Sequence, residues 1–172
     1  IAGINAALKI KGEPPLILTR DSSYIGTLID DLVTKGTREP YRIMTSRSEY
    51  RLLLRQDNAE ARLSGFGRRV GLLQEERWAA AERRSAAVTA EIARARQTVL
   101  PPTEELNALL EARGTTPVRS GVTLDELLRR PELDYEALAP IDRMRPALDR
   151  RILLSAQTEL KYDGYVRRQM AE

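Results

Sequence analysis

The sequence predicts a mainly α-helical chain, and three observations support this fold class. Aromatic residues make up only 5% of the 172 residues, so the core must be built from Leu, Ile, Val and Ala, which favours helices over packed sheets. Apolar residues recur at spacings of three and four over several stretches, as they do on one face of a helix. Charged residues make up 31% of the chain, which fits helices with a large solvated surface. We expect short strands at most, near residues 40–56.

Caps and helix breakers set the order of the expected helices. Ser, Thr and Asp side chains can accept hydrogen bonds from the free amide groups at a helix start, whereas Gly and Pro end a helix. The longest helix carries a seam of small and apolar residues that suits close packing against a neighbouring helix. On these grounds we expect helices over 1–11, from 21 or 22 to 36, over 74–99, over 104–113, after Thr123, and over 148–170.

The composition excludes several chemistries. The chain contains no His and no Cys, so it can form no Ser-His-Asp or Cys-His nucleophile, no disulfide and no zinc site of the usual ligands. Asp30 and Asp31 are neighbours on an expected helix, where adjacent side chains point about 100° apart and cannot act as a pair. We therefore expect neither catalytic residues nor a metal site. The uncharged stretches are too short to cross a bilayer and no signal-peptide pattern opens the chain, which favours the cytoplasm.

Positive charge is concentrated in one segment. The net charge of the chain is only +3, but residues 35–69 hold nine basic against four acidic residues, and the remainder is slightly acidic. Eight of the nine are Arg, whose planar guanidinium can bind two phosphate oxygens at once. The nine basic residues are Lys35, Arg38, Arg42, Arg47, Arg51, Arg55, Arg62, Arg68 and Arg69.

The spacing of Arg47, Arg51 and Arg55 places these side chains on one surface under either of two local structures. Ser46 and Glu49 have the spacing of a helical capping box, and in a helix the three arginines form a stripe at every fourth residue. In a strand the same three share the outer face. The alternative to a binding surface is that individual arginines pair with nearby carboxylates. The carboxylates available for such pairs are Asp30, Asp31, Glu39 and Asp57.

Residues 24–73 resemble a known family. Their sequence reads YIGTLIDDLVTKGTREPYRIMTSRSEYRLLLRQDNAEARLSGFGRRVGLL. It is similar to the region that follows the flavin domain in the glucose-inhibited division protein A (MnmG) family, the tRNA uridine 5-carboxymethylaminomethyl modification enzymes. Residues 1–7 resemble the tail of that family's second signature, and residues 161–165 are similar to its late helix. Between 74 and 149 the likeness is looser and lies mostly in helical character.

The resemblance implies the C-terminal part of a flavoenzyme. Members of the family use FAD, NADH and a methylene-folate, and they work with an MnmE-type GTPase to build a carboxymethylaminomethyl group on the wobble uridine of tRNA. The family's cofactor-binding glycines and catalytic cysteine would lie before residue 1, and a further lobe would lie beyond residue 172. This part alone is therefore expected to bind no cofactor and to catalyse nothing, within a protein that forms a homodimer.

The resemblance also implies a domain division and a set of candidate site residues. The implied parts are the tail of an FAD-binding domain with a linker over 1–20, an Arg-rich, mainly helical segment over 21–73, and a helical C-terminal domain over 74–172. We expect the arginine-rich segment to contact tRNA phosphates or to hold the flavin domain. The candidate residues are Arg38, Arg42, Arg47, Arg51 and Arg55, with Lys35 and Arg62 as further candidates.

The last expected helix supplies a second candidate surface. Tyr162, Tyr165 and Val166 are spaced by three and four residues and can form an anchor for a protein partner. Their alternative role is ordinary core packing. The competing hypothesis for the whole chain is accordingly a structural helical module that serves partner docking or dimerisation.

Overall fold

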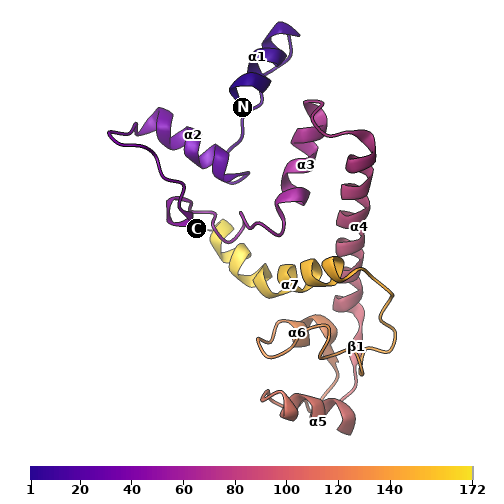
Figure 1. Cartoon of the computed structure of the whole chain (residues 1–172). Coiled ribbons are helices and arrows are strands. Elements are labelled where there is room, and N and C mark those ends of the chain that lie inside the picture. Colours follow the sequence, from indigo (N-terminus) through magenta and orange to yellow (C-terminus); the bar gives the residue numbers. More distant parts are fainter. Residues whose placement is uncertain (172) are drawn as a thin grey trace. The chain divides into compact units, whose positions relative to one another are not determined.

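The computed structural model describes residues 1–171, and these are mainly α-helical, which confirms the predicted fold class (Figure 1). The N-terminal helices are α1 (Ala2–Ile10), α2 (Tyr24–Thr34) and α3 (Ala59–Arg69), with a short 3-10 turn at Thr45–Arg47. The remaining helices are α4 (Glu75–Gln97), α5 (Glu104–Ala112), α6 (Leu124–Leu128) and α7 (Arg150–Ala171). Two strands of two residues each, β1 (Val99–Leu100) and β2 (Val122–Thr123), pair antiparallel, and they do not lie near residues 40–56, where the sequence predicts any short strands.

The chain divides into two compact units, which are described separately. Unit 1 comprises residues 1–83 together with the last residues of the chain from 165 on, and unit 2 comprises residues 84–164. The two longest helices, α4 and α7, each contribute residues to both units. None of the helices within residues 1–171 combines the length and the apolar character that crossing a bilayer would require.

Unit 1 is held together by caps and polar contacts as much as by apolar packing. The Asn5 side chain makes two hydrogen bonds to the backbone of Leu16, which ties α1 to the segment that follows it. Ser23 caps α2 by accepting a hydrogen bond from the Gly26 amide at 3.0 Å. Gly26 is required here because a Cβ atom would lie 2.6 Å from the Thr19 carbonyl carbon. The start of α2 therefore packs directly against the backbone that leads to Arg20.

Residues 47–55 form neither the helix nor the strand that their spacing predicts. Arg47 ends the 3-10 turn, and the following residues form a series of tight turns. The expected capping box fails because the Glu49 carboxylate binds Arg20 rather than the backbone amide of Ser46. The hydroxyl of buried Ser48 instead accepts a hydrogen bond from the Tyr50 amide at 3.2 Å. The ion pair between Glu49 and the distant Arg20 therefore replaces the helix start that the local sequence predicts.

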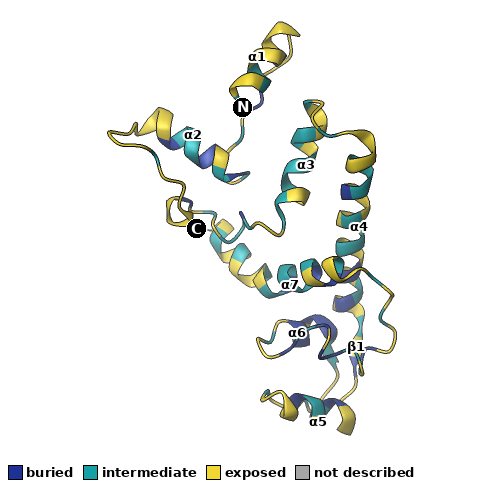
Figure 2. Ribbon diagram, viewed as in Figure 1, coloured by how far each residue is buried: buried dark blue, intermediate teal, exposed yellow. Residues whose placement is uncertain are grey.

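Unit 2 contains a leucine-rich core. Leu106 and Leu110 of α5, Leu127 of α6 and Leu160 of α7 are almost completely buried in one cluster, and Figure 2 shows α6 largely in the colour of buried residues. Thr103 caps α5, as predicted, by accepting from the Leu106 amide. The capping box after Thr123 is also present, with the Glu126 carboxylate accepting from the Thr123 amide at 3.2 Å. At the starts of α5 and α6, the capping residues observed in the structure are the ones that the sequence predicts.

Candidate nucleic-acid interface

The segment between α2 and the turns before α3 carries several exposed arginines, and we call residues 35–51 the basic loop. Arg38, Arg42 and Arg51 are exposed. Within residues 1–171, no ion pair or hydrogen bond engages their side chains. Their guanidinium groups consequently remain available to an anion from solution.

Arg47 is exposed as well, but its position is fixed by an aromatic ring. Its guanidinium carbon lies 4.6 Å from the centre of the Tyr41 ring, which is a cation–π distance. The Tyr41 hydroxyl in turn donates a hydrogen bond to the Asp31 carboxylate at 2.6 Å. Arg47 is thus held in place by a residue that is itself anchored to α2.

Three other candidates are engaged inside the protein. Arg55, whose side chain is only 10% exposed, binds both carboxylate oxygens of Asp57 and also donates to the Leu52 carbonyl. Arg62 donates to backbone carbonyls of Ser22 and Arg55, and its burial lowers its pKa from the ordinary value. Lys35 binds Asp31 at 2.8 Å. The structure therefore keeps Arg38, Arg42, Arg47 and Arg51 at the surface and turns the other three candidates toward protein groups.

Arg20 is the central residue of this region, and it is not among the residues predicted from the sequence. Its Nε and Nη2 atoms bind the two Glu49 oxygens at 2.7 and 2.8 Å, and Nη1 binds Asp30 at 2.9 Å and Asp31 at 2.8 Å. Nη2 also donates to the Arg47 carbonyl at 3.2 Å. Nothing in the local sequence around Arg20 marks it, because its partner Glu49 is 29 positions away.

The carboxylates of this network are strongly stabilised in their charged form. Hydrogen bonds from Arg20 lower the pKa of Glu49 to about 2, against an ordinary value of 4.5. Hydrogen bonds from Lys35, Tyr41 and Arg20 hold the pKa of buried Asp31 far below its usual range. The same Asp31 contact raises the pKa of Tyr41. The network therefore stays ionised at neutral pH.

A glutamine near the end of α7 supports the turns that follow the 3-10 segment. The Gln169 side chain donates to the Glu49 carbonyl and accepts from the Leu52 amide at 3.3 Å. Because both groups belong to unit 1, the last turns of α7 belong with the basic loop rather than with the leucine-rich core.

The second predicted surface lies on α7. Tyr162 and Tyr165 are 37% and 56% exposed, and Val166 is half-buried. The Arg168 guanidinium lies over the Tyr165 ring at 5.1 Å. These three residues therefore lie at least partly at the surface rather than deep in a core.

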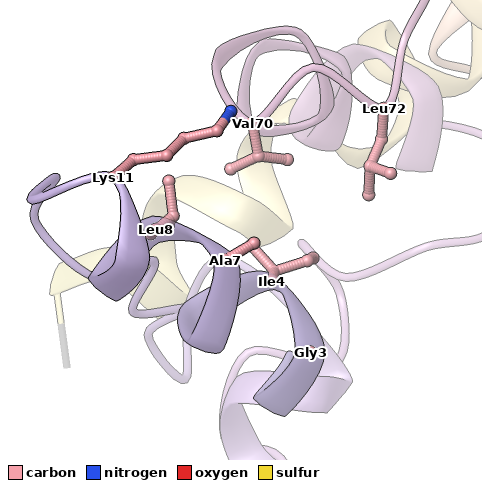
Figure 3. A pocket seen from close by; sticks show the side chains of 7 residues that line it. All are labelled: Gly3, Ile4, Ala7, Leu8, Lys11, Val70 and Leu72. Carbon is pink, nitrogen blue, oxygen red and sulfur yellow. The ribbon is translucent and has the colours of Figure 1, made fainter.

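Unit 1 also contains an apolar pocket of about 220 Å³. Figure 3 shows Ile4, Ala7 and Leu8 of α1 facing Val70 and Leu72, which follow α3. The wall is almost entirely aliphatic, and Lys11 is the one lining residue with an ionisable side chain. Within residues 1–171, no group of acidic side chains is arranged to hold a metal ion.

The fold and this surface define a class: a helical module that displays arginines on a loop held in place by ion pairs and hydrogen bonds to carboxylates. The comparisons identify the family. Residues 75–170 match the family model described as "tRNA modifying enzyme MnmG/GidA C-terminal helical domain". The chain is 51% identical over all 172 residues to a protein of Caldicellulosiruptor saccharolyticus named tRNA uridine 5-carboxymethylaminomethyl modification enzyme MnmG. A protein of the same name from Lachnoclostridium phytofermentans is 48% identical over 169 residues.

Solved structures agree with the sequence comparison. Two crystal forms of Aquifex aeolicus GidA match 99% of this chain with TM-scores of 0.84 and 0.81, at 33% and 34% sequence identity. The chain belongs to the MnmG/GidA family. It spans only 28% and 27% of the two curated relatives and 26% and 25% of the two solved chains.

Proposed function

We propose that this chain is the C-terminal helical part of a tRNA uridine 5-carboxymethylaminomethyl modification enzyme and that its basic loop binds tRNA. The observation that carries the proposal is the division of the arginines in unit 1. Arg38, Arg42 and Arg51 are exposed without a partner in the described part of the chain, and Arg47 is held at the surface by Tyr41. Exposed guanidinium groups on a loop suit the phosphates of a folded RNA.

The longer protein is proposed to act in the cytoplasm on the wobble uridine, with FAD, NADH, an MnmE-type GTPase and a second copy of itself. Residues 1–171 do not fit a dinucleotide by themselves, because their strands form one short antiparallel pair and no βαβ unit. Flavin chemistry therefore belongs, in this proposal, to the part of the relatives that lies outside this chain. The residues described here position RNA and contribute no proton or electron transfer.

The test compares two arginine pairs in the intact protein. Arg42→Ala with Arg51→Ala removes two exposed charges from the basic loop, whereas Arg113→Ala with Arg119→Ala removes two exposed charges from unit 2. Binding of an in vitro transcribed tRNA is measured across a range of salt concentrations. The loop pair is expected to weaken binding and to flatten the dependence of log affinity on log salt by about 0.7 to 0.9 for each phosphate that is no longer neutralised.

The control pair, Arg113→Ala with Arg119→Ala, shows whether a change in tRNA binding is specific to the basic loop. It should leave the salt dependence close to that of the wild-type protein. If both pairs behave alike, or if the loop pair changes neither the affinity nor its salt dependence, the basic loop does not bind tRNA. The competing role, partner docking or dimerisation through Tyr162, Tyr165 and Val166, would then take its place, since two of these side chains are well exposed.

A further inference from the structure

The acidic residues around the basic loop form two groups. Asp31 and Glu49 are tied into hydrogen bonds with Arg20, Lys35 and Tyr41. Asp21 and Glu39, by contrast, are exposed, and their side chains have no hydrogen bond or ion pair among the described residues. Both groups carry negative charge close to a surface proposed to bind a polyanion. Only the first group also joins separate segments of the chain.

Arg20 is a bridge rather than a phosphate-binding residue. A guanidinium has five N–H donors, and all five of Arg20 are used: two for Glu49, one each for Asp30 and Asp31, and one for the Arg47 carbonyl. Through these bonds Arg20 links the end of the 3-10 turn to α2. An incoming phosphate could bind Arg20 only by breaking hydrogen bonds that are already made.

The basic loop needs such bridges because its backbone provides little structure. Residues 37–43 lie in no helix or strand, and none of their backbone groups hydrogen-bonds to another backbone group in the described part of the chain. Two side-chain links hold the basic loop instead, one at Tyr41 within this segment and one at Glu49 beyond it. One runs from Asp31 through Tyr41 to Arg47, and the other runs from Asp31 through Arg20 to Glu49. Without them the exposed arginines would be displayed on a flexible segment.

We propose that Asp31 and Glu49 are positioning residues for tRNA, which act through Tyr41 and Arg20 to hold the arginines of the basic loop in the arrangement that binds phosphates. The inference rests on the proposed function and adds to it a role for acidic residues in RNA binding. Pre-organisation is the physical reason, because a loop that is already ordered loses less conformational entropy when it binds.

This inference and simple electrostatics predict opposite results for the same change. Removing a negative charge near a phosphate-binding surface should strengthen RNA binding if the carboxylate acts only through its charge. Removing a carboxylate that holds the loop should weaken RNA binding, although the protein becomes more positive. The sign of the effect therefore separates the two roles.

The experiment compares Glu49→Gln with Glu39→Gln in the intact protein. The two variants make the same charge change on the same loop, but only Glu49 has a partner in the structure. Glu49→Gln is expected to weaken binding of transcribed tRNA about tenfold, the effect of breaking a charge-assisted hydrogen-bond pair that orders a segment. Its salt dependence should flatten by about 0.7 to 0.9 for each arginine that no longer reaches a phosphate. Glu39→Gln should bind as tightly as the wild-type protein or more tightly.

Arg20→Lys gives a second, charge-neutral test. Lysine keeps the positive charge but cannot reproduce the planar set of five donors. We expect weaker tRNA binding and a flatter salt dependence, as with Glu49→Gln. Circular dichroism and the melting temperature of each variant show whether the helices remain folded, and the salt dependence reports phosphate binding independently of the fraction of active protein.

The outcomes separate this inference from the proposed function. If Arg42→Ala with Arg51→Ala does not weaken tRNA binding, the proposed function fails and the inference fails with it. If that pair weakens binding but Glu49→Gln binds as tightly as Glu39→Gln, the basic loop binds tRNA and the positioning role is wrong. The same conclusion follows if Arg20→Lys leaves both the affinity and the salt dependence unchanged.

Discussion

Arginine serves three different purposes in this chain, and the groups around each guanidinium decide which. Arg20 and Arg94 bind several carboxylate oxygens and so stabilise buried negative charge. Arg62 donates to backbone carbonyls and joins the start of α3 to the residues before α2. Arg42 and Arg51 have no protein partner within residues 1–171. Only the last kind is suited to an external anion, since its donors are not yet used.

Arg94 neutralises two buried carboxylates in unit 2. It binds Glu91 at 2.7 Å and Asp142 at 2.6 Å, and these carboxylates are only 1% and 2% exposed. Arg94→Ala would leave two buried negative charges without a counter-ion, and should lower the free energy of unfolding of unit 2 by about 3 to 5 kcal/mol. Native-state hydrogen exchange of the α4 amides measures this opening free energy.

Arg143→Ala is the matched control for Arg94→Ala. Arg143 also pairs with a carboxylate, that of Glu105, but the two side chains are 76% and 56% exposed. Such a surface pair contributes about 0 to 1 kcal/mol, so exchange of the same amides should hardly change. An equally small effect for Arg94→Ala would show that its two carboxylates find other partners or water.

At the residue scale, the sequence predicts where positive charge gathers but not which arginine is available. Arg55 and Asp57 are two positions apart, so their pairing was among the alternatives that the sequence left open. Arg20 and Glu49 are 29 positions apart, and their pairing depends on how α2 packs. Whether an arginine is free depends on carboxylates that approach it in space. Spacing along the chain carries that information only for near neighbours.

At the element scale, helices were predictable where a cap lies beside them. Ser and Thr caps are present at the starts of α2, α5 and α6, and the corresponding helices were expected. Helix α3 was not expected as a separate element, and its N-cap residue Asn58 makes no side-chain capping bond. The prediction of a helix or strand over 47–55 is wrong, because the Glu49 carboxylate binds Arg20 and the residues form turns. The predictions from local sequence were wrong where contacts between residues far apart in the chain determine the backbone structure.

Gly26 lies where the start of α2 packs closely against the backbone of Leu18 and Thr19. Alanine has the higher helix propensity, so a Gly→Ala change inside a helix ordinarily stabilises by about 1 kcal/mol. At Gly26 the added Cβ would lie 2.6 Å from the Thr19 carbonyl carbon and 2.7 Å from the Leu18 oxygen, and backbone atoms cannot easily move aside. Gly26→Ala should therefore destabilise α2 by about 1 to 3 kcal/mol. The measurement is exchange of the α2 amides.

Gly65→Ala is the control for this change. Gly65 lies inside α3, and nothing lies within 4 Å of the position its Cβ would take. The variant should stabilise α3 by about 0.5 to 1 kcal/mol. If Gly26→Ala were to stabilise α2 in the same way, the backbone around Thr19 would have to be free to move.

At the scale of the whole molecule, the two units differ in how much apolar core they contain. Unit 2 buries a cluster of leucines from α5, α6 and α7. Unit 1 buries few large apolar side chains, among them Leu8, Leu16 and Leu54, and it also buries the charged Asp31. Apolar packing does not depend directly on pH, whereas an ionised carboxylate network does. Unit 2 also buries the carboxylates of Glu91 and Asp142 beside Arg94, so the comparison under acid is between two helices: α2, which is tied to Asp31 and Glu49, and α5, whose buried residues are leucines.

The pH dependence of α2 follows from the sign of the carboxylate shifts. The folded state lowers the pKa of Glu49 to about 2 from 4.5, and that of Asp31 is lowered too. Their stabilisation is therefore complete above the ordinary pKa and is lost progressively as the pH falls from 4.5 toward 2. Between pH 7 and pH 3, exchange of the α2 amides, corrected for the intrinsic rate, should accelerate more than exchange of the α5 amides.

Glu49→Gln supplies the internal control, because it removes one of the titrating groups. In that variant α2 should be less protected at pH 7 than in the wild-type protein, and its protection should fall less steeply with acid. The α5 amides, which belong to the leucine-rich core, should respond alike in both proteins. An unchanged pH dependence of α2 in Glu49→Gln would show that other groups set its acid stability. Loss of protection in α5 at a higher pH than in α2 would contradict the expected difference between these two helices.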